Sequence, residues 1–509
     1  MAKLYREKSG QENGAHGMIE GCLVFLLKIA AAVYLFAILA VLPLYYRDGY
    51  KHIGTDKSTF FRKWGGWIIV TAAVLATALI IVRVIRAVWR KEKPSAQKLF
   101  GNFTYIDFLA AGFGIMIVVS HLCSLYREEA KWGATGWFMG TLPQLILVGS
   151  YFLISRKCGE EHFLPFYVLP VSSIVIVLGI LNKFGFYPVD MKIQNSNFIS
   201  TIGNINWYCG YLVVVLFFAV GYFIFKQEIK LWARCALAFY IVLGFTSLET
   251  QGSDSGVFAL ATVLVILFWL AARDYAWLVR FSIVLFLLTV CGFAIWLIRE
   301  KNIWDISVSD LDRGTEILTH TFFAVIFFAA AFIFLIVSIW FKNRQKNLRL
   351  IQVFAALGLI LYVAVILAYV LFLWINTLKN GAVSEKFGFT DTAMFVMDES
   401  WGSNRGATWK AGVLAFKEQD PLHKLVGVGP DCMSAYIYTD GSEEIRTLVN
   451  NLFGNAKLTN AHNEWLTILV NEGILGFVFY VGMISSAIIV FLKKRSKDPV
   501  VCACGLAIL

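Results

Sequence analysis

Long apolar runs recur from one end of this chain to the other, and they constrain its fold more than any other feature. Each run is roughly 18–25 residues long, the length that spans a bilayer as an α-helix. Only 16% of the 509 residues are charged, and 58% are hydrophobic. Because a backbone in lipid must satisfy its own hydrogen bonds, such runs fold as helices. The sequence therefore predicts an all-α, polytopic integral membrane protein with about 12 transmembrane helices.

The apolar runs divide the chain into five parts. A polar tail, residues 1–20, precedes transmembrane helices 1–11, which lie within residues 21–376. A long polar segment, residues 377–463, separates them from transmembrane helix 12 at 464–492. Residues 493–509 begin with a basic stretch, after which the chain ends either in an interfacial stub or part-way into a further span. The predicted spans are 21–46, 67–83, 105–126, 137–155, 163–181, 207–225, 235–248, 256–272, 281–298, 322–341, 350–376 and 464–492.

Charge predicts how the helices are oriented. With the N-terminus inside, the inner segments hold most of the lysine and arginine, notably 83–98, 342–349 and 493–497, although the predicted outer loop 47–63 is also basic. This places residues 377–463 outside the cell, where they are expected to form a small helical cap. The net charge of +11 is that of cytoplasmic loops meeting anionic lipid, not of a nucleic-acid binder.

The cysteines predict neither disulfides nor a metal centre. There are nine of them, an odd number, and most lie within apolar runs. Cys502 and Cys504 form a Cys-x-Cys pair, but no second pair of ligands accompanies it, so a zinc site is not expected. The acidic residues form neither a glycosidase-like carboxylate pair nor a metal motif. We expect no metal and no cofactor.

The segment expected to form the cap contains recognisable local structure. Residues 405–419 have the composition of a helix that Asp420-Pro421 would stop, and residues 434–438 and 442–453 are candidates for short helices. The sequence GVGPD at 427–431 lies between them. Its backbone N–H groups could bind an anion, but the absence of a P-loop or dinucleotide motif favours a tight turn.

The stretch AHNEWLTILVNEGILGFVFY, residues 461–480, joins the cap to the last span. As a continuous helix it would align on one face His462, Leu466, Leu469, Gly473, Gly476 and Tyr480. Glycines on that face would let a second helix or a lipid chain approach closely. His462 stands at the outer end, where a neutral imidazole can act as a general base. It is otherwise a polar residue at the membrane interface. Asn463 and Glu464 complete a polar cluster, in which Glu464 either orients the imidazole or is an ordinary acid of the first helical turn.

Two further sets of residues are candidates for substrate binding. Arg405 carries a guanidinium that can bind phosphate with two parallel hydrogen bonds, and Trp409 follows one helical turn later, where it can pack on sugar or lipid. The alternatives are a solvated loop arginine and a tryptophan that anchors the cap helix. Asn204 and Asn206 precede the span at 207–225, where they either cap the helix or line an outer cavity. Asp254 is expected to cap the eighth span.

Four segments together resemble the O-antigen ligase and O-antigen polymerase superfamily of bacterial membrane glycosyltransferases. They are GNIN at 203–206, RGATW at 405–409, GVGPD at 427–431 and HNEWLTILVNEGILG at 462–476. The segment WGATGWFMG at 132–140 is similar to Gram-positive-type members. The resemblance implies a GT-C-like helical fold in the bacterial cytoplasmic membrane. It also implies metal-independent, inverting transfer of a glycan from an undecaprenyl-diphosphate carrier to an acceptor hydroxyl outside the cell.

The resemblance also implies roles for particular residues. His462 matches the histidine at the end of the family's large loop, which is expected to activate the acceptor, and Arg405 matches a loop arginine expected to hold the diphosphate. Many members carry a further arginine in a Ser-Arg-Gly element, where this chain has QGSDSG at 251–256. Either Arg313 or Arg446 replaces that cation, or the diphosphate is recognised differently.

Two other classes of protein compete with the enzyme. A lipid-linked oligosaccharide flippase, or another transporter without catalysis, should carry charges through the depth of several spans and show related halves. A membrane scaffold or sensor would use neither Arg405 nor His462. The charges of this chain lie mainly in loops, which favours the enzyme. Within that class, the acceptor distinguishes a capsule, exopolysaccharide or O-antigen polymerase from a ligase that transfers glycan to lipid or protein.

Overall fold

The fold is that of a computed structural model of the 509-residue chain. The structure describes residues 2–93, 95–157, 164–193, 197–301, 316, 319–388, 395–454, 456–494, 502, 504 and 505. These residues are mainly helical, and the sheet among them is a single antiparallel pair, in which Phe198 pairs with Asn204 and Ile199 with Gly203. The all-α membrane fold predicted from the sequence is therefore confirmed.

Each predicted span coincides with a helix. In the described part of the chain, 10 helical stretches are long and apolar enough to cross a membrane. The spans predicted at 137–155 and 256–272 correspond to shorter helices, α8 and α12. The chain separates into two compact units, each assembled from segments that are distant in the sequence.

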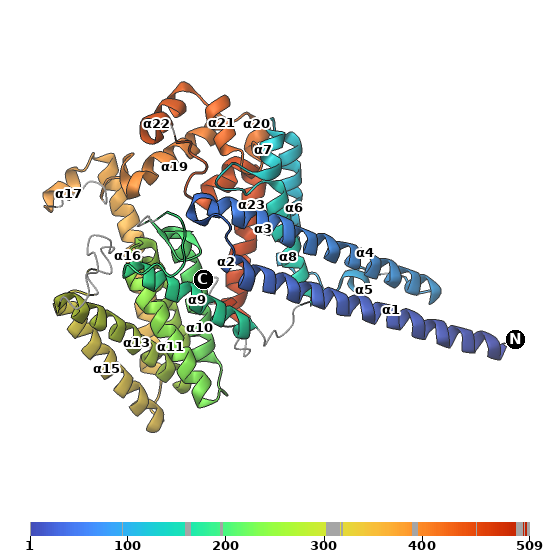
Figure 1. The fold of residues 1–509 in the computed structure, drawn as a ribbon, viewed down its shortest axis with the longest axis horizontal. Helices are drawn as coiled ribbons and strands as arrows, with labels where there is room; N and C mark the ends of the chain where they lie inside the picture. The colour runs from blue at the N-terminus through green and yellow to red at the C-terminus, as the bar shows by residue number, and fades with distance from the viewer. Residues whose placement is uncertain are drawn as a thin grey trace. The chain divides into compact units, whose positions relative to one another are not determined.

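The first unit comprises Met1–Ile38, Lys57–Gly159 and Val370–Ala487. Its membrane helices are α1 (Ala2–Phe36), α4 (Gly66–Trp89), α6 (Tyr105–Cys123), α8 (Thr141–Lys157), the end of α16 (Arg349–Leu378) and α23 (Glu464–Lys494). Shorter elements are the π-helix η3 (Phe61–Gly65), α5 (Ala96–Phe100), α7 (Arg127–Trp132), α17 (Ala382–Lys386), α19 (Trp401–Glu418), α20 (Pro421–Val426), α21 (Met433–Thr439) and α22 (Glu443–Phe453). Figure 1 shows α1 and α4 running side by side, and α19, α21 and α22 gathered together.

The second unit comprises Leu39–Asp56, Glu160–Tyr369 and Ile488–Leu509. Its elements include α2 (Leu42–Leu44), the 3-10 helix η2 (Gly49–His52), α9 (Leu164–Lys183), β1 (Phe198–Ile199), β2 (Gly203–Asn204), α10 (Ile205–Phe225), α11 (Leu231–Thr250), α12 (Asp254–Ala271), α13 (Tyr275–Glu300), α15 (Thr321–Asn343) and most of α16. The π-helix η1 (Ala37–Val41) and helix α3 (Ile53–Phe60) lie where the chain passes between the units. Helix α10 is the centre of the core, since its fully buried Tyr208, Phe217 and Phe223 pack against the neighbouring helices.

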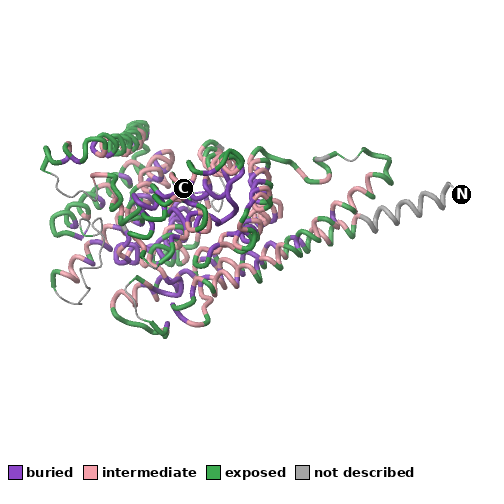
Figure 2. The backbone as a smooth tube through the Cα atoms, turned by 90° about the horizontal axis from the view of Figure 1, so that it is seen from above, coloured by how far each residue is buried: buried purple, intermediate pink, exposed green. Residues whose placement is uncertain are grey.

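The cap has a hydrophobic core of its own within the first unit. Small residues of α19, namely Ala407, Ala411 and Ala415, are at most 1% exposed, and they pack against Met433 and Ile437 of α21. Because alanine side chains keep the helices close, this core is dense although the segment is polar overall. In Figure 2, the described part of the helix nearest the N-terminus, α1, is coloured mostly as half-buried or exposed.

Two sequence expectations about local structure are wrong. The predicted loop 47–63 is largely helical, because η2, α3 and η3 run into α4 as one helical stretch, Gly49–Trp89. Its lysines and arginines suggested a loop, but they are compatible with helix at a membrane border. The residue at the N-cap of α12 is Ser253, and Asp254 is the first residue of the helix.

Candidate functional site

Helix α19 positions Arg405. Gly402, Ser403 and Asn404 have left-handed backbone angles, with φ between 60° and 69°, so the regular helix begins only at Arg405. It ends at Glu418, after which Asp420 caps α20 by accepting hydrogen bonds from the N–H groups of Leu422 and His423. The helix predicted at 405–419 and its Asp-Pro stop are thus confirmed. Arg405 itself is exposed.

The chain before α23 holds His462 beside α19. Thr408 Oγ1 donates a hydrogen bond of 3.0 Å to the carbonyl of Ala461, and a Cβ added at Gly412 would lie 3.4 Å from the Ala461 Cβ. His462 has φ 49°, and its N–H donates a 2.7 Å bond to Asn460 Oδ1. The Ala461–His462 segment is therefore fixed against the first turn of α19. Arg405 and His462, 57 residues apart in the sequence, meet at this junction.

The surroundings of His462 favour a neutral imidazole. Partial burial by the neighbouring segments, and then the positive charge of Arg405, lower the pKa of His462 below its ordinary value of 6.5. The side chain nevertheless remains exposed on one side. At neutral pH the ring is thus unprotonated and open to a reactant, as general-base catalysis requires.

A cavity of about 1160 Å³ adjoins this junction. Gly406 and Asn463, the chain neighbours of Arg405 and His462, line it. Its walls come from the end of α16, from one face of α19 and from the first turns of α23. The lining residues are Trp374, Thr377, Leu378, Met397, Asp398, Glu399, Ser400, Gly406, Trp409, Lys410, Val413, Leu414, Lys417, Asn463, Trp465, Leu466, Leu469 and Phe477. The cavity is larger than the roughly 300–1,000 Å³ that is typical of small-molecule sites, and its lining is mainly apolar.

The structure places the remaining cap residues at distinct positions around the cavity. Trp409 lines it and packs edge-on against Trp401 at 5.3 Å, while the Trp409 indole N–H is buried with no hydrogen-bond partner in the described chain. Asn463 lines it too, and caps α23 by accepting a 3.2 Å bond from the Leu466 N–H. Glu464 instead lines a smaller cavity of about 230 Å³, and no hydrogen bond to His462 is found within the described ranges.

The structure adds two cations that the sequence analysis missed. Lys410 and Lys417 line the large cavity, and Lys410 Nζ forms a 2.9 Å ion pair with Glu399. Both lysines lie on the face of α19 that includes Trp409. The helical spacing of these residues in the sequence could have indicated that they share a face. Lys417 lies 12 residues beyond Arg405, about 18 Å along the helix axis. Lys410 is the nearer cation.

Helix α23 is not continuous, and this overturns the predicted single face from His462 to Tyr480. The helix begins at Glu464, and Gly473 breaks it with φ 70° and ψ −174°. The break frees two carbonyls, and the GVGPD turn uses them. Val428 N–H donates to Val470 O at 3.2 Å, and Gly429 N–H donates to Asn471 O at 3.0 Å. Because those N–H groups are occupied, the anion-loop interpretation of GVGPD is wrong and the tight turn is confirmed.

The glycines near this break allow backbone to approach backbone. A Cβ added at Gly473 would lie 2.5 Å from the backbone nitrogen of Gly427, and one added at Gly427 would lie 2.0 Å from the Asn471 carbonyl oxygen. The neighbour admitted by Gly473 is thus the end of α20, and neither a second membrane helix nor a lipid chain. The turn and the broken helix form one rigid joint beneath the site.

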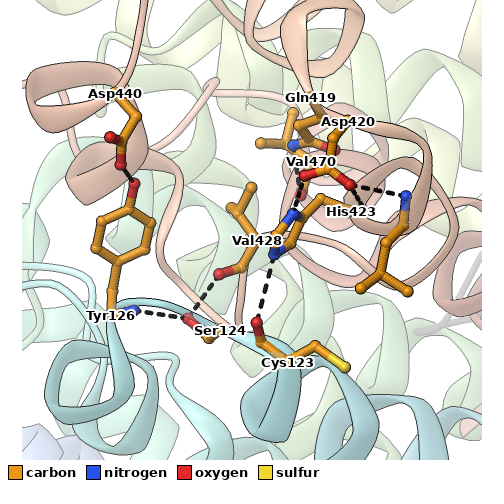
Figure 3. A network of polar contacts seen from close by, with 10 residues as sticks. Cys123, Ser124, Tyr126, Gln419, Asp420, His423, Val428, Asp440 and Val470 are labelled. Carbon is orange, nitrogen blue, oxygen red and sulfur yellow. Dashed lines mark hydrogen bonds and ion pairs between the residues drawn. The ribbon is translucent and has the colours of Figure 1, made fainter.

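Further polar contacts fasten the cap to the end of α6 (Figure 3). Ser124 Oγ donates a 2.6 Å bond to Val428 O and accepts one of 3.1 Å from the Tyr126 N–H. His423 contacts the Asp420 carboxylate through Nδ1 and the Cys123 carbonyl through Nε2, at 3.3 Å. Through Nε2, the ring of His423 connects α20 to the end of α6. The hydrogen bond to His423 lowers the pKa of Asp420.

Asp431, the last residue of the GVGPD turn, is 1% exposed. Its Oδ2 accepts hydrogen bonds from the backbone N–H groups of Ala134 and Met139, at 2.8 and 2.9 Å. These two residues belong to the WGATGWFMG segment, so the contact joins two of the motifs recognised in the sequence. Burial raises the pKa of Asp431 from 3.8 to about 7, although the two N–H groups oppose the shift.

The remaining predicted site residues are Asn204, Asn206, Arg446 and Arg313. Asn204 and Asn206 belong to the second unit: Asn204 caps α10 by accepting from the Asn206 N–H, and Asn206 Oδ1 accepts a 3.0 Å bond from Ser253. The cap role predicted for Asn204 is thereby confirmed. Arg446 is exposed on α22, whose opposite face is buried. Arg313 lies outside the described residues.

Comparison with protein families identifies the region that contains the site. Residues 314–481 match the family model described as O-Antigen ligase. The chain carries an O-antigen ligase domain. The match contains Arg405, the GVGPD turn and His462, and it confirms the resemblance that these motifs predicted. Comparison with curated proteins and with solved structures gives no match.

The O-antigen ligase domain implies the general reaction. The chain therefore fits glycan transfer of the O-antigen ligase or polymerase type, for which the family implies a lipid-linked glycan and an acceptor. Its many apolar helices agree with the bacterial inner membrane in which this family resides. The GNIN segment, 203–206, lies outside the matched residues.

Proposed function

We propose that this protein transfers a glycan from an undecaprenyl-diphosphate carrier to an acceptor hydroxyl on the outer side of the membrane. The reaction needs no metal and inverts the anomeric centre. The reaction is part of cell-envelope polysaccharide biosynthesis. The enzyme is either a polymerase of capsule, exopolysaccharide or O-antigen, or a ligase. The observation that carries the proposal is the junction of Arg405 and His462 beside the large cavity.

His462 is the proposed general base. A hydroxyl is a weak nucleophile unless its proton is removed as it attacks, and the lowered pKa keeps the imidazole ready to accept that proton at neutral pH. The acceptor oxygen forms a bond to the anomeric carbon while the bond from that carbon to the diphosphate oxygen breaks. The proton goes to His462, and the electron pair of the broken bond leaves with the diphosphate. A single displacement of this kind inverts the centre.

Arg405 is the proposed partner of the leaving group. The diphosphate gains negative charge as it departs, and a guanidinium stabilises that charge through two parallel hydrogen bonds. The same positive charge lowers the pKa of His462, so one residue supports both halves of the reaction. The buried indole N–H of Trp409, which has no partner among the described residues, is available to a sugar or phosphate oxygen.

The apolar walls of the cavity fit the carrier lipid. Trp374 and Leu378 of α16 and Phe477 of α23 line part of it, whereas the charged lining residues lie on α19 and on the loop before it. A polyprenyl chain would lie along the former, with its diphosphate near the latter. A lipid-linked donor requires both a charged and an apolar surface. A soluble sugar nucleotide does not require the apolar one.

The test is glycan transfer by purified protein supplied with lipid-linked oligosaccharide and acceptor. His462→Ala and Arg405→Ala should each reduce product formation at least ~100-fold, because each removes a group that acts in the transition state. Arg127→Ala and His320→Ala are matched controls at exposed positions outside the junction, and they should retain activity. Full activity of both junction variants, with the normal elution profile, would refute the site.

Further measurements address the finer parts of the proposal. Activity should survive EDTA if no metal takes part, and NMR of the product linkage should show inversion. A ladder of lengthened carrier-linked chains would identify a polymerase, whereas a single transfer to a different acceptor would identify a ligase. Movement of intact donor across a vesicle membrane without any new glycosidic bond would instead support the flippase alternative.

A further inference from the structure

A second cavity of the first unit combines an apolar groove with a surplus of positive charge. Its volume is about 460 Å³, within the range of roughly 300–1,000 Å³ that is typical of small-molecule sites. Leu27, Ala73 and Leu79 line it along α1 and α4, and Arg83, Arg156 and Lys157 line it where α4 and α8 end. Helix α5 and the residues after it complete its charged end.

The carboxylates at this end are already engaged. Glu20 bridges Arg83 and Arg86, at 2.8 and 2.7 Å, and Asp107 forms a 2.9 Å ion pair with Arg156. Glu20 and Asp107 are therefore both already in ion pairs within the protein. Among the described residues, the charges that act on the neighbouring Lys157 are all positive.

Further cations are present, and they leave the charge unbalanced. Lys157 is half-buried and lies within electrostatic reach of Lys28, Arg83 and Arg156, and no acidic group of the described residues acts on it. Neither Lys28 nor Lys157 has an ion pair in the described part of the chain. Clustered like charges beside a low-dielectric groove are unfavourable unless an anion joins them.

The groove limits which anion fits. The charged end lies at the ends of two helices predicted to span the membrane, and the apolar part extends along those helices, where α4 is mostly exposed. An amphiphile with an anionic head and an acyl chain satisfies both parts, since basic pockets at the ends of membrane helices bind such headgroups. Free phosphate would use only the charged end.

We propose that this groove is a binding site for an anionic phospholipid, separate from the glycan-transfer site. The phosphate lies against Lys28, Lys157 and the guanidinium of Arg83, and one acyl chain lies along the residues of α1 and α4. By the orientation that the loop charges predict, this lipid belongs to the cytoplasmic leaflet. Bound there, it neutralises the surplus charge and fills the space between α1, α4 and α8.

The test is lipid binding by the purified full-length protein, measured by native mass spectrometry with phosphatidylglycerol or phosphatidylcholine. Phosphatidylglycerol should be retained in preference. Lys28→Ala with Lys157→Ala should weaken its binding roughly 30-fold, because each basic residue near an anionic lipid contributes about a factor of five. Lys342→Ala with Lys346→Ala, which removes the same charge from the second unit, should have no effect.

A groove-filling variant separates lipid from free anion. Ala73→Trp leaves every cation in place and should still reduce phosphatidylglycerol binding, and glycerol phosphate should not displace the bound lipid. Equal retention of the two lipids, or unchanged binding in the double lysine variant, would overturn the proposal. Displacement by glycerol phosphate, together with full binding in Ala73→Trp, would assign the cations to a soluble phosphate and overturn it as well.

Discussion

Substitution of Gly473 by alanine should loosen the joint between the cap and α23. With φ 70° and ψ −174°, this residue occupies a region of backbone space that is essentially restricted to glycine. Holding another residue there costs about 1–3 kcal/mol. The new Cβ would also lie 2.5 Å from the backbone atoms Gly427 N and Leu425 C, and a backbone cannot rotate away as a side chain can.

Relief of that contact must move the turn, and the turn holds two hydrogen bonds. They run from the Val428 and Gly429 N–H groups to the Val470 and Asn471 carbonyls, at 3.2 and 3.0 Å. Each contributes about 0.5–1.5 kcal/mol, so the total expected loss is about 2–6 kcal/mol. Because Gly429 and Asn471 lie beneath the junction of α19 and His462, glycan transfer should fall together with stability.

The assay compares apparent melting temperatures in detergent with transfer rates. Gly482→Ala is the matched control, because it lies on the same helix and its added Cβ would meet only the flexible end of Leu109, at 3.2 Å. We expect Gly473→Ala to melt several degrees below both the parent and Gly482→Ala. If the two variants melt alike, the broken helix does not form the joint described, and the argument fails.

Three further predictions concern the site and its support. The acidic limb of the pH–rate profile should lie below pH 6.5, because the pKa of His462 is lowered. The limb should move to higher pH in Arg405→Gln but not in Arg405→Lys, because only Arg405→Gln removes the positive charge that helps to lower this pKa. A limb that does not move in Arg405→Gln would contradict His462 as the base. For Asp431, the folded pKa of about 7 lies above the ordinary 3.8, so its contribution to stability is complete at low pH and is lost as the pH rises through 7, by on the order of 4 kcal/mol. Melting measured from pH 4 to 8 should show this decline, which is complete once the pH exceeds the folded pKa, in the parent and lack it in Asp431→Asn. Ser124→Ala should cost about 1–2 kcal/mol, because the buried Val428 carbonyl loses its 2.6 Å donor, and chemical unfolding that matches the parent would refute this.

Much of the cap could be predicted because its signals are local. The Asp420-Pro421 pair ends one helix and caps the next, and the helical spacing of small residues from Ala407 to Ala415 marks a packed face. Local signals also placed the membrane helices. Arg405 and His462 could be proposed separately from their residue types and the family resemblance, but their junction depends on a Thr408–Ala461 contact that no short window contains.

What could not be predicted depends on contacts between distant segments. Gly473 sits in a run whose composition is that of a continuous helix, and it breaks only because the turn at Gly427 supplies new partners for the freed carbonyls. Asp431 looks like an ordinary turn residue, yet its partners are N–H groups of Ala134 and Met139. Sequence periodicity indicates the secondary structure of neighbouring residues, and it does not indicate contacts between segments that are far apart in the chain.

The discontinuity of the first unit has a consequence for how this protein is made. Ala134 and Asp431 are 297 residues apart, and Ser124 and Val428 are 304 apart. The segment that receives the cap therefore leaves the ribosome long before the cap itself, and most of the second unit is synthesised in the interval. Contacts of such long range form late. The donors of Ala134 and Met139 must remain unpaired, or hydrated, until residue 431 arrives, so the part of the molecule that holds the proposed glycan-transfer site is completed last. A truncated chain that ends before the cap would insert its helices and yet present an unfinished binding surface.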